Sequence, residues 1–266
     1  MTLNVCLAGA TGWAGSELAR GIAGASDLTL VSAVSRTHAG KTLGDVLGDT
    51  RLSAPVFGRA ADALARPCDV FVEYTTAASA KSNVVTALQH GAHVVVGASG
   101  LTDADFGEID AVARERRRGV LACGNFALTV VLLQKFAEMA AKHIPHWEVI
   151  DYAYEGKPDA PSGTARELAT RMAKVRRPEI GVPVAKTIGQ PEARGADLSG
   201  TQVHSLRLPG FVLGAEVIFG MPDQTLSLRH NAGTSAKPYV DGALLAIRKV
   251  STLVGVYRGL DAVLDM

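Results

Sequence analysis

The chain has 266 residues, of which 47% are hydrophobic and 20% charged, and its formal net charge is +1. These values are typical of a globular protein with one or two domains, and they exclude an intrinsically disordered chain. A net charge so close to zero also excludes a global electrostatic attraction to nucleic acid or to an anionic membrane.

Through the first half of the chain, short apolar runs alternate with stretches that have helical hydrophobic spacing. Strands are predicted at Leu3–Ala8, Leu28–Val34, Val70–Glu73, His93–Val96 and Gly119–Ala122. Helices are predicted over Ser16–Ala25, Ser79–His90 and Asp103–Arg117. Because the strand runs are continuously apolar, they fit a parallel sheet covered on both faces. The order predicts an α/β domain with a Rossmann-type, doubly wound parallel sheet.

The pattern changes near Asn125, where a second, smaller α+β domain with a mixed, open sheet is expected. Helices are predicted at Phe126–His143 and Thr164–Lys174, and strands at Trp147–Tyr154, Thr201–Leu208, Phe211–Phe219 and Gln224–Asn231. The last three strands alternate in polarity, which predicts antiparallel pairing with one covered face. Residues 176–200, rich in glycine, proline and charge, are expected to form a mobile excursion.

The predicted domain boundaries follow from these changes of pattern. Residues 1–124 form the first domain, residues 125–236 form the second, and a helix over Tyr239–Val250 is expected to return residues 237–266 to the first.

A glycine-rich segment, Gly9–Gly15, follows the first strand and precedes the first helix. Gly9 would permit a tight turn, Gly12 would let the backbone approach a pyrophosphate, and Gly15 would allow helix and strand to pack closely. The free N–H groups at the helix N-terminus would then face the phosphates. The segment predicts a dinucleotide cofactor, with a tight turn that holds no ligand as the alternative.

The second strand ends at Ser35-Arg36-Thr37, where an NAD-preferring site usually carries an acidic residue. A hydroxyl and a guanidinium suit a 2′-phosphate, which a carboxylate would repel. NADPH is therefore the predicted cofactor, and NADH stays possible. In the alternative interpretation Arg36 is only a surface charge.

A second polar segment runs from Lys157 to Glu167 and contains Asp-Ala-Pro-Ser-Gly-Thr-Ala. Thr164 and Glu167 have the spacing of a capping box, so a helix is predicted to start there. Ser162, Gly163 and Thr164 would offer hydroxyls and backbone N–H groups to a carboxylate, and Lys157 would supply charge or a proton. An ordinary cap with a solvated Lys157 is the alternative.

With these motifs the chain resembles the dihydrodipicolinate reductase family, the 4-hydroxy-tetrahydrodipicolinate reductases of lysine and diaminopimelate biosynthesis. The similarity covers nearly the whole chain, and its most specific segment is Asp159–Ala165. The other similar segments are Val5–Gly15, Glu73–Thr76, Gly97–Gly100, Gly124–Phe126, Val203–Arg207, Glu216–Phe219 and the terminal helix around Gly242.

The resemblance implies roles for the matching residues. Cofactor contacts are implied for Gly9, Thr11, Gly12, Gly15, Arg36, Thr75, Gly97, Ala98, Ser99, Gly124, Asn125 and Phe126, and Trp13, Ala14, Ser35 and Thr76 are predicted to join them. Substrate contacts are implied for Lys157, Ser162, Gly163 and Thr164, with Lys157 the leading proton donor. The second domain would bind substrate and build a homotetramer.

One stretch departs from the family, whose members normally carry a histidine pair in a string such as His-His-Arg-His-Lys. Here the same positions read Ala153-Tyr154-Glu155-Gly156-Lys157. Tyr154 can donate a hydrogen bond but brings no positive charge, and Glu155 would disfavour a second substrate carboxylate. We expect C=N reduction to be retained, with Lys157, Tyr154 or water as proton donor, and substrate choice to be open to drift.

The leading hypothesis is an NADPH-dependent oxidoreductase that reduces a C=N bond in a small cyclic, carboxylate-bearing substrate. One alternative is an imine reductase for a less acidic cyclic imine, and another is a catalytically inactive NADPH-binding regulatory protein. None of the three cysteines and seven histidines has metal-ligand spacing, so no metal site is expected. The cysteines indicate a cytoplasmic compartment, and no signal peptide, membrane segment or nucleic-acid partner is expected.

Overall fold

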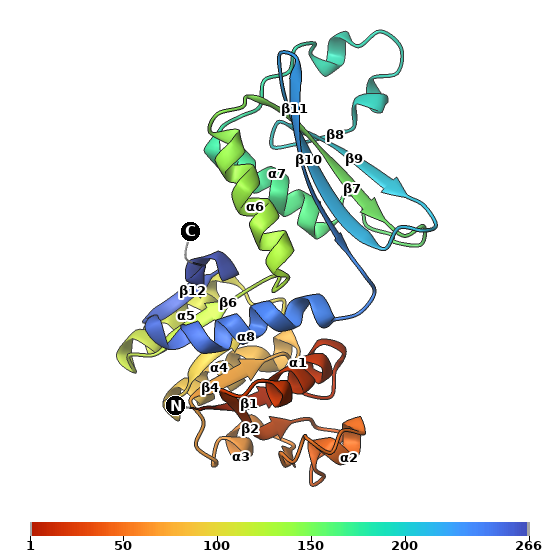
Figure 1. Cartoon of the computed structure of the whole chain (residues 1–266). Coiled ribbons are helices and arrows are strands. Elements are labelled where there is room, and N and C mark those ends of the chain that lie inside the picture. Colours follow the sequence, from red (N-terminus) through yellow and green to blue (C-terminus); the bar gives the residue numbers. More distant parts are fainter. Residues whose placement is uncertain (1, 265–266) are drawn as a thin grey trace. The chain divides into compact units, whose positions relative to one another are not determined.

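The computed structural model describes residues 2–264. The chain divides into two compact units, one made of Met1–Leu128 with Ala236–Met266 and the other of Thr129–Ser235 (Figure 1). The sequence pattern placed the first boundary after Gly124, whereas Phe126 packs against Tyr74 of the first unit, with ring centroids 5.7 Å apart. The segment that follows Gly124 therefore belongs structurally to the first unit as far as Leu128.

The first unit contains a parallel sheet of seven strands within the described residues, in the order β12-β6-β5-β4-β1-β2-β3. The strands are β1 (Leu3–Ala8), β2 (Leu28–Val34), β3 (Val56–Phe57), β4 (Val70–Glu73), β5 (His93–Val96), β6 (Gly119–Ala122) and β12 (Gly255–Arg258). Strands β4, β5 and β6 are buried along nearly their whole length, as parallel strands covered on both faces should be. The predicted doubly wound sheet is confirmed.

Helices cover both faces of this sheet (Figure 1). They are α1 (Trp13–Gly24), α2 (Leu43–Leu47), α3 (Ala60–Ala63), α4 (Ala77–Gln89), α5 (Asp103–Glu115) and α8 (Val240–Lys249), with short 3₁₀ turns at Lys237–Tyr239, Val250–Thr252 and Leu260–Val263. Helix α8 packs beside α1, while α4 packs between α3 and α5 on the opposite face. The C-terminal segment thus returns to the first unit and also supplies the edge strand β12, which the sequence pattern did not predict.

The strand order places a topological switch point at β1. This strand pairs with β2 on one side and with β4 on the other, and all three run parallel. Ligands of open α/β sheets bind beyond the carboxyl ends of the strands at such a point. The glycine segment that follows β1 therefore lies where this fold offers a nucleotide site.

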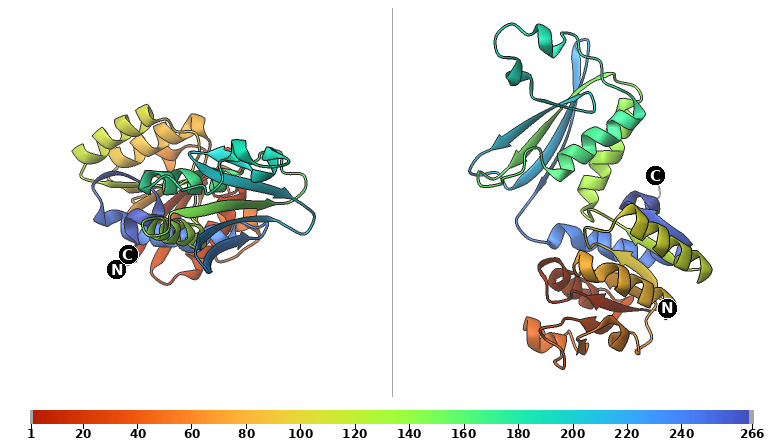
Figure 2. Two further views of the ribbon diagram at one scale, coloured as in Figure 1. Left: turned by 90° about the horizontal axis from the view of Figure 1, so that it is seen from above. Right: turned by 180° about the vertical axis from the view of Figure 1, so that it is seen from behind.

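The second unit contains a mixed sheet in the order β11-β10-β7-β9-β8. Its elements are α6 (Leu128–Ala141), β7 (His146–Ala153), α7 (Gly163–Val175), 3₁₀ turns at Val184–Lys186 and Pro191–Arg194, β8 (Ala196–Leu198), β9 (Thr201–Arg207), β10 (Leu213–Met221) and β11 (Gln224–Ala232). Helices α6 and α7 cover one face and the other carries no helix (Figure 2). Trp147, Val149 and Val217 point into the covered core with Leu168 of α7.

The pairing of β9 corrects one prediction. The three alternating runs were expected to be antiparallel, and β10 does pair with β11 in that way, but β9 runs parallel to β7 and does not pair with β10. Parallel neighbours need a long crossover, which α7 and the segment after it provide between β7 and β9. That segment, the predicted excursion, itself contains the two 3₁₀ turns and the edge strand β8.

Candidate active site

The loop after β1 forms a tight turn in which glycine is required. Gly9 has a φ of +80°, and its carbonyl oxygen accepts a hydrogen bond from Gly12 N at 3.0 Å. A Cβ on Gly15 would collide with the same carbonyl group, and a Cβ on Gly9 would collide with the backbone of Tyr74. The glycines therefore allow the loop, α1 and the end of β4 to approach one another closely.

The N-terminus of α1 is left open to a ligand. Its N-cap is Gly12, which has no side chain to accept a hydrogen bond, and its first turn contains no acidic residue. The N–H groups of Trp13, Ala14 and Gly15 belong to the first turn, which lacks intrahelical acceptors. Uncapped N–H groups and the helix dipole fit the pyrophosphate of a dinucleotide.

A cavity of about 610 Å³ runs from this loop along the ends of β2 and β4. Its walls include the predicted cofactor residues Gly9, Thr11, Gly12, Ser35, Arg36, Thr75 and Thr76. Ser35 is buried, and its Oγ lies 2.9 Å from Thr11 Oγ1, which ties the end of β2 to the phosphate loop. The volume and the polar walls suit the adenosine and phosphate groups of a dinucleotide.

A second cavity of the first unit, of about 290 Å³, contains the other predicted cofactor residues except Gly15. Its walls include Trp13, Ala14, Thr75, Gly97, Ala98, Ser99, Gly124, Asn125 and Phe126, together with Tyr74, Cys123 and Tyr239. Gly15 is buried behind the loop and lines neither cavity. The hydroxyl of Tyr74 is buried and has no hydrogen-bond partner among the described residues. Tyr74 therefore adds a polar group that is free to bond a ligand to the aromatic wall of this cavity.

Glu73 anchors the segment that separates the two cavities. Its Oε1 accepts from Thr75 N at 2.6 Å and from Thr75 Oγ1 at 2.5 Å, and its Oε2 accepts from Asn83 Nδ2 at 2.8 Å. Burial raises the pKa of Glu73 above its ordinary value, although these three hydrogen bonds act in the opposite direction. The bonds fix Thr75, which lines both cavities.

In the second unit, Asp151 of β7 organises the Pro-Ser-Gly-Thr corner. Its Oδ2 accepts from Ser162 N at 2.9 Å and from Arg207 Nη2 at 2.7 Å, and the same nitrogen of Arg207 donates to the carbonyl of Asp159 at 2.6 Å. Burial acts to raise the pKa of Asp151, but the hydrogen bonds from Ser162 and Arg207 outweigh it and lower that pKa. One ion pair, with a buried carboxylate and a partly buried guanidinium, thus holds both sides of the corner.

The helix at this corner starts two residues earlier than its capping-box spacing predicted. The N-cap of α7 is Ser162, whose Oγ accepts from Ala165 N at 3.3 Å, and Thr164 is already inside the first turn. Extended backbone at Ser162, held by Asp151, starts the helix there. The first turn contains no acidic residue, which leaves the N–H groups of Gly163 and Thr164 for an anionic ligand.

Lys157 lies in the loop ahead of this corner. Its Nζ donates to Asp159 Oδ1 at 2.5 Å, and this hydrogen bond lowers the pKa of Asp159. Tyr154 is 47% exposed, and its hydroxyl has no partner within residues 2–264. Ala153 is fully buried, while Glu155 is exposed. The stretch that replaces the histidine pair therefore contributes no imidazole and one solvated carboxylate.

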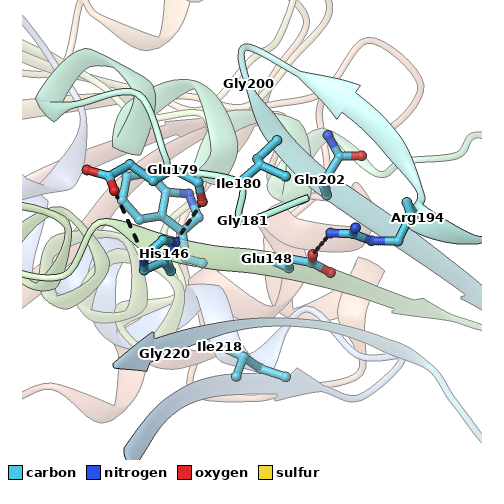
Figure 3. A pocket seen from close by; sticks show the side chains of 11 residues that line it. His146, Glu148, Glu179, Ile180, Gly181, Arg194, Gly200, Gln202, Ile218 and Gly220 are labelled. Atoms are coloured by element: carbon cyan, nitrogen blue, oxygen red, sulfur yellow. Dashed lines mark hydrogen bonds and ion pairs between the residues drawn. The ribbon is translucent and has the colours of Figure 1, made fainter. Parts of the chain in front are cut away.

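A further cavity of the second unit, of about 330 Å³, lies apart from the predicted residues (Figure 3). Its walls include His146, Glu148, Glu179, Arg194 and Gln202, and none of the predicted site residues lines it. Glu148 accepts from Arg194 at 2.9 Å and lies 2.7 Å from Nε2 of His204, which agrees with a structural role for His204.

Neither a metal-binding cluster nor a membrane-spanning helix is present in the described part of the chain. Within residues 2–264, no cluster of three His, Cys, Asp or Glu side chains is arranged to hold a metal ion. Over the same residues, no helix combines the length and the hydrophobicity that a membrane crossing requires.

The sequence pattern missed several residues of these sites. Asp151 and Arg207 lie in strands, where single charged residues are ordinarily solvated, and only folding brings them together across β7 and β9. Arg59 lines the 610 Å³ cavity, but it follows a strand of two residues that is too short to recognise. One signal for Arg207 was present in the sequence, because Val203–Arg207 is one of the segments that resemble the family.

Comparisons with known proteins cover the whole length of the chain. The family model described as dihydrodipicolinate reductase, N-terminus, matches residues 3–126, and the one described as dihydrodipicolinate reductase, C-terminus, matches residues 129–264. A protein of Moorella thermoacetica named 4-hydroxy-tetrahydrodipicolinate reductase is 38% identical, over 99% of this chain and 98% of its own. A protein of Bacillus pumilus with the same name is 36% identical, with the same coverage.

A solved structure gives the same result. Dihydrodipicolinate reductase from Paenisporosarcina sp. TG-14, with dipicolinate bound, superimposes with a TM-score of 0.88 at 28% identity. The match covers 99% of this chain and 100% of that one.

Proposed function

This chain belongs to the dihydrodipicolinate reductase family, and we propose that it catalyses the NADPH-dependent reduction of the C=N bond of a small, cyclic, carboxylate-bearing substrate. The reaction is that of a 4-hydroxy-tetrahydrodipicolinate reductase in lysine and diaminopimelate biosynthesis. The observation that carries the proposal is a pair of open helix N-termini, at α1 beside the 610 Å³ cavity and at α7 in the segment that follows Lys157.

The first unit binds the coenzyme in this proposal. The N–H groups at the start of α1 hold the pyrophosphate, while Ser35 and Arg36 face the adenosine ribose from the end of β2. The smaller cavity has the aromatic walls and the glycine backbone that suit a nicotinamide ring. The hydride for the substrate carbon comes from the reduced nicotinamide when that coenzyme is bound.

The second unit binds the substrate. A substrate carboxylate accepts hydrogen bonds from the N–H groups of Gly163 and Thr164. The hydroxyls of Ser162 and Thr164 lie at the same helix N-terminus and are further donors. The buried Asp151–Arg207 pair keeps the corner in place while the substrate enters and leaves. Because orientation supplies much of the rate of a two-reactant step, rigidity at this corner serves the chemistry directly.

Reduction of a C=N bond adds a hydride to carbon and a proton to nitrogen. Lys157 donates the proton from its ammonium group, which Asp159 orients through the 2.5 Å hydrogen bond, and the amine recovers a proton from solvent. Tyr154 is a second candidate donor, placed at the same strand end.

We propose a homotetramer in the cytoplasm as the working form. Along β7 and β10, Ile150, Tyr152 and Ile218 alternate with core residues, so they lie on the face that carries no helix, and they are only partly buried in one chain. The same face also carries Glu148, Glu216 and Arg229, so it is a mixed apolar and charged surface, which is suited to association with further copies.

The proposal is tested by following NADPH absorbance with 4-hydroxy-tetrahydrodipicolinate and with a panel of other cyclic imines. We expect turnover of the dicarboxylate, and a fall in kcat of about a hundredfold or more for Lys157→Ala, the size typical of a lost general acid. Coenzyme affinity should be unchanged in this variant, because Lys157 lies in the second unit.

Lys142→Ala is the matched control, since Lys142 is exposed and lies outside the corner. An unchanged kcat in Lys157→Ala would remove this lysine from the mechanism. A wild-type protein that binds no reduced nicotinamide coenzyme would defeat the whole proposal.

A further inference from the structure

The ends of β2 and β3 place two arginines at equivalent positions of one sheet edge. The strands are parallel, and their last residue pair is Val34 with Phe57. Arg36 and Arg59 each follow their strand's paired residue by two positions. Beyond that pair, Ser35 N donates a hydrogen bond to Phe57 O at 2.9 Å, so the two chains stay adjacent for one more residue. Because in-register parallel strands end together, the two arginines leave the sheet from neighbouring strand ends.

Both arginines line the 610 Å³ cavity, and both are exposed. Neither has an ion-pair partner among residues 2–264, and the described walls of the cavity include no carboxylate. Two guanidinium groups without a counterion on the wall of one cavity offer a doubly charged anion two cationic partners. The charge pattern of the wall therefore calls for a phosphate rather than for a neutral hydroxyl.

Hydroxyl groups at the same strand end complete the surroundings of such an anion. Ser35 Oγ lies 2.9 Å from Thr11 Oγ1 and 3.2 Å from Nδ1 of His38, and Thr37 Oγ1 lies 2.9 Å from the same nitrogen. These groups bond to one another, which fixes the end of β2 from which Arg36 projects. Arg59 comes from a different element, the residue immediately ahead of α3.

We infer that Arg59 is a second cationic ligand for the 2′-phosphate of NADPH, and that Arg36 and Arg59 together set the preference for NADPH over NADH. The inference rests on the proposed function, since it assumes that a dinucleotide occupies the loop Gly9–Gly15. A 2′-phosphate carries up to two negative charges near neutral pH, so one arginine alone does not neutralise it. Two arginines do.

The test measures the Kd of NADPH and of NADH by titration of the full-length protein and of three Arg→Gln variants. In Arg59→Gln, the Kd of NADPH should rise about tenfold, the effect of one lost hydrogen bond to a charged group. The Kd of NADH should stay within about twofold of the wild-type value, because NADH has no 2′-phosphate. Arg36→Gln should show the same selective loss.

Arg66→Gln is the control, since Arg66 is exposed, follows the same helix and does not line the cavity, so it removes the same net charge elsewhere. If Arg59→Gln binds NADPH like the wild type, or weakens NADPH and NADH equally, the assignment of Arg59 is overturned while the proposed function stands. If the wild type binds neither coenzyme, the proposed function and this assignment are both overturned.

Discussion

At the scale of single residues, the second unit depends on one buried carboxylate. Asp151 joins three segments, because its Oδ2 accepts from Ser162 N and Arg207 Nη2, and Arg207 reaches on to the carbonyl of Asp159. Removing one partner of a buried ion pair costs more than the pair itself contributes, since the remaining charge has no counterion. The corner that we assign to the substrate is therefore held in place by the hydrogen bonds of Asp151 and Arg207.

We expect Asp151→Asn to lower the free energy of unfolding by about 3 kcal/mol at neutral pH, because it removes the buried carboxylate that pairs with the largely buried guanidinium of Arg207. The folded-state pKa of Asp151 lies below its ordinary value of 3.8, so the stabilisation is present above that pH and is lost as the pH falls further. Urea unfolding at several pH values should show the gap between wild type and variant closing below about pH 4.

Asp223→Asn serves as the control, because Asp223 is an exposed turn residue with a φ of +58°, which asparagine tolerates. A gap of the same size at pH 3 and pH 7 would contradict the role given to the Asp151 charge.

At the scale of elements, both proposed ligands bind at the N-terminus of a helix. Helix α1 begins at a glycine N-cap and helix α7 begins at a serine, and neither has an acidic residue in its first turn. Most helices attract carboxylates to that turn, and α5 has two there. Helices α4 and α6 share this feature, and at α1 and α7 it leaves the N-terminal N–H groups for anions that come from outside the chain.

The position of the cap in α7 can be tested with two alanine variants. Ser162→Ala should lower stability by about 1 kcal/mol, because Ala165 N loses its acceptor, and it should raise KM for a carboxylate substrate. Thr164→Ala should leave stability nearly unchanged, since Thr164 follows the cap and its side chain accepts no capping bond. Thermal unfolding of both variants decides the question, and a larger loss in Thr164→Ala would restore the cap to Thr164.

At the scale of the whole molecule, the coenzyme and the substrate are assigned to two units that are built from different segments of the chain. The first is built from both ends of the chain, and the second is inserted between Leu128 and Ala236. The second unit also has the sheet face that carries no helix, which a single chain leaves partly exposed. Assembly is the property that we assign to this face.

We expect Ile150→Asp to dissociate the proposed tetramer, because it places an unpaired carboxylate beside Glu216 in a desolvated interface. Light scattering should give about four times the chain mass of 27.7 kDa for the wild type and a smaller multiple for the variant. Val254→Asp is the control, an apolar residue that is 46% exposed in the first unit. A wild-type mass of one chain would refute the tetramer.

The sequence by itself determined the local features of this protein. Continuous apolar runs identified the central strands, and the glycine segment after β1 identified the tight loop ahead of α1, because both depend on residues adjacent in the chain. Ser162, Gly163 and Lys157 were recognised as candidates for the same reason. Only the tertiary structure decided that β9 lies parallel to β7, that Asp151 meets Arg207, and that Arg36 and Arg59 line the same cavity. Each of these is a pairing between distant segments, fixed by strand register and burial, which no local pattern encodes.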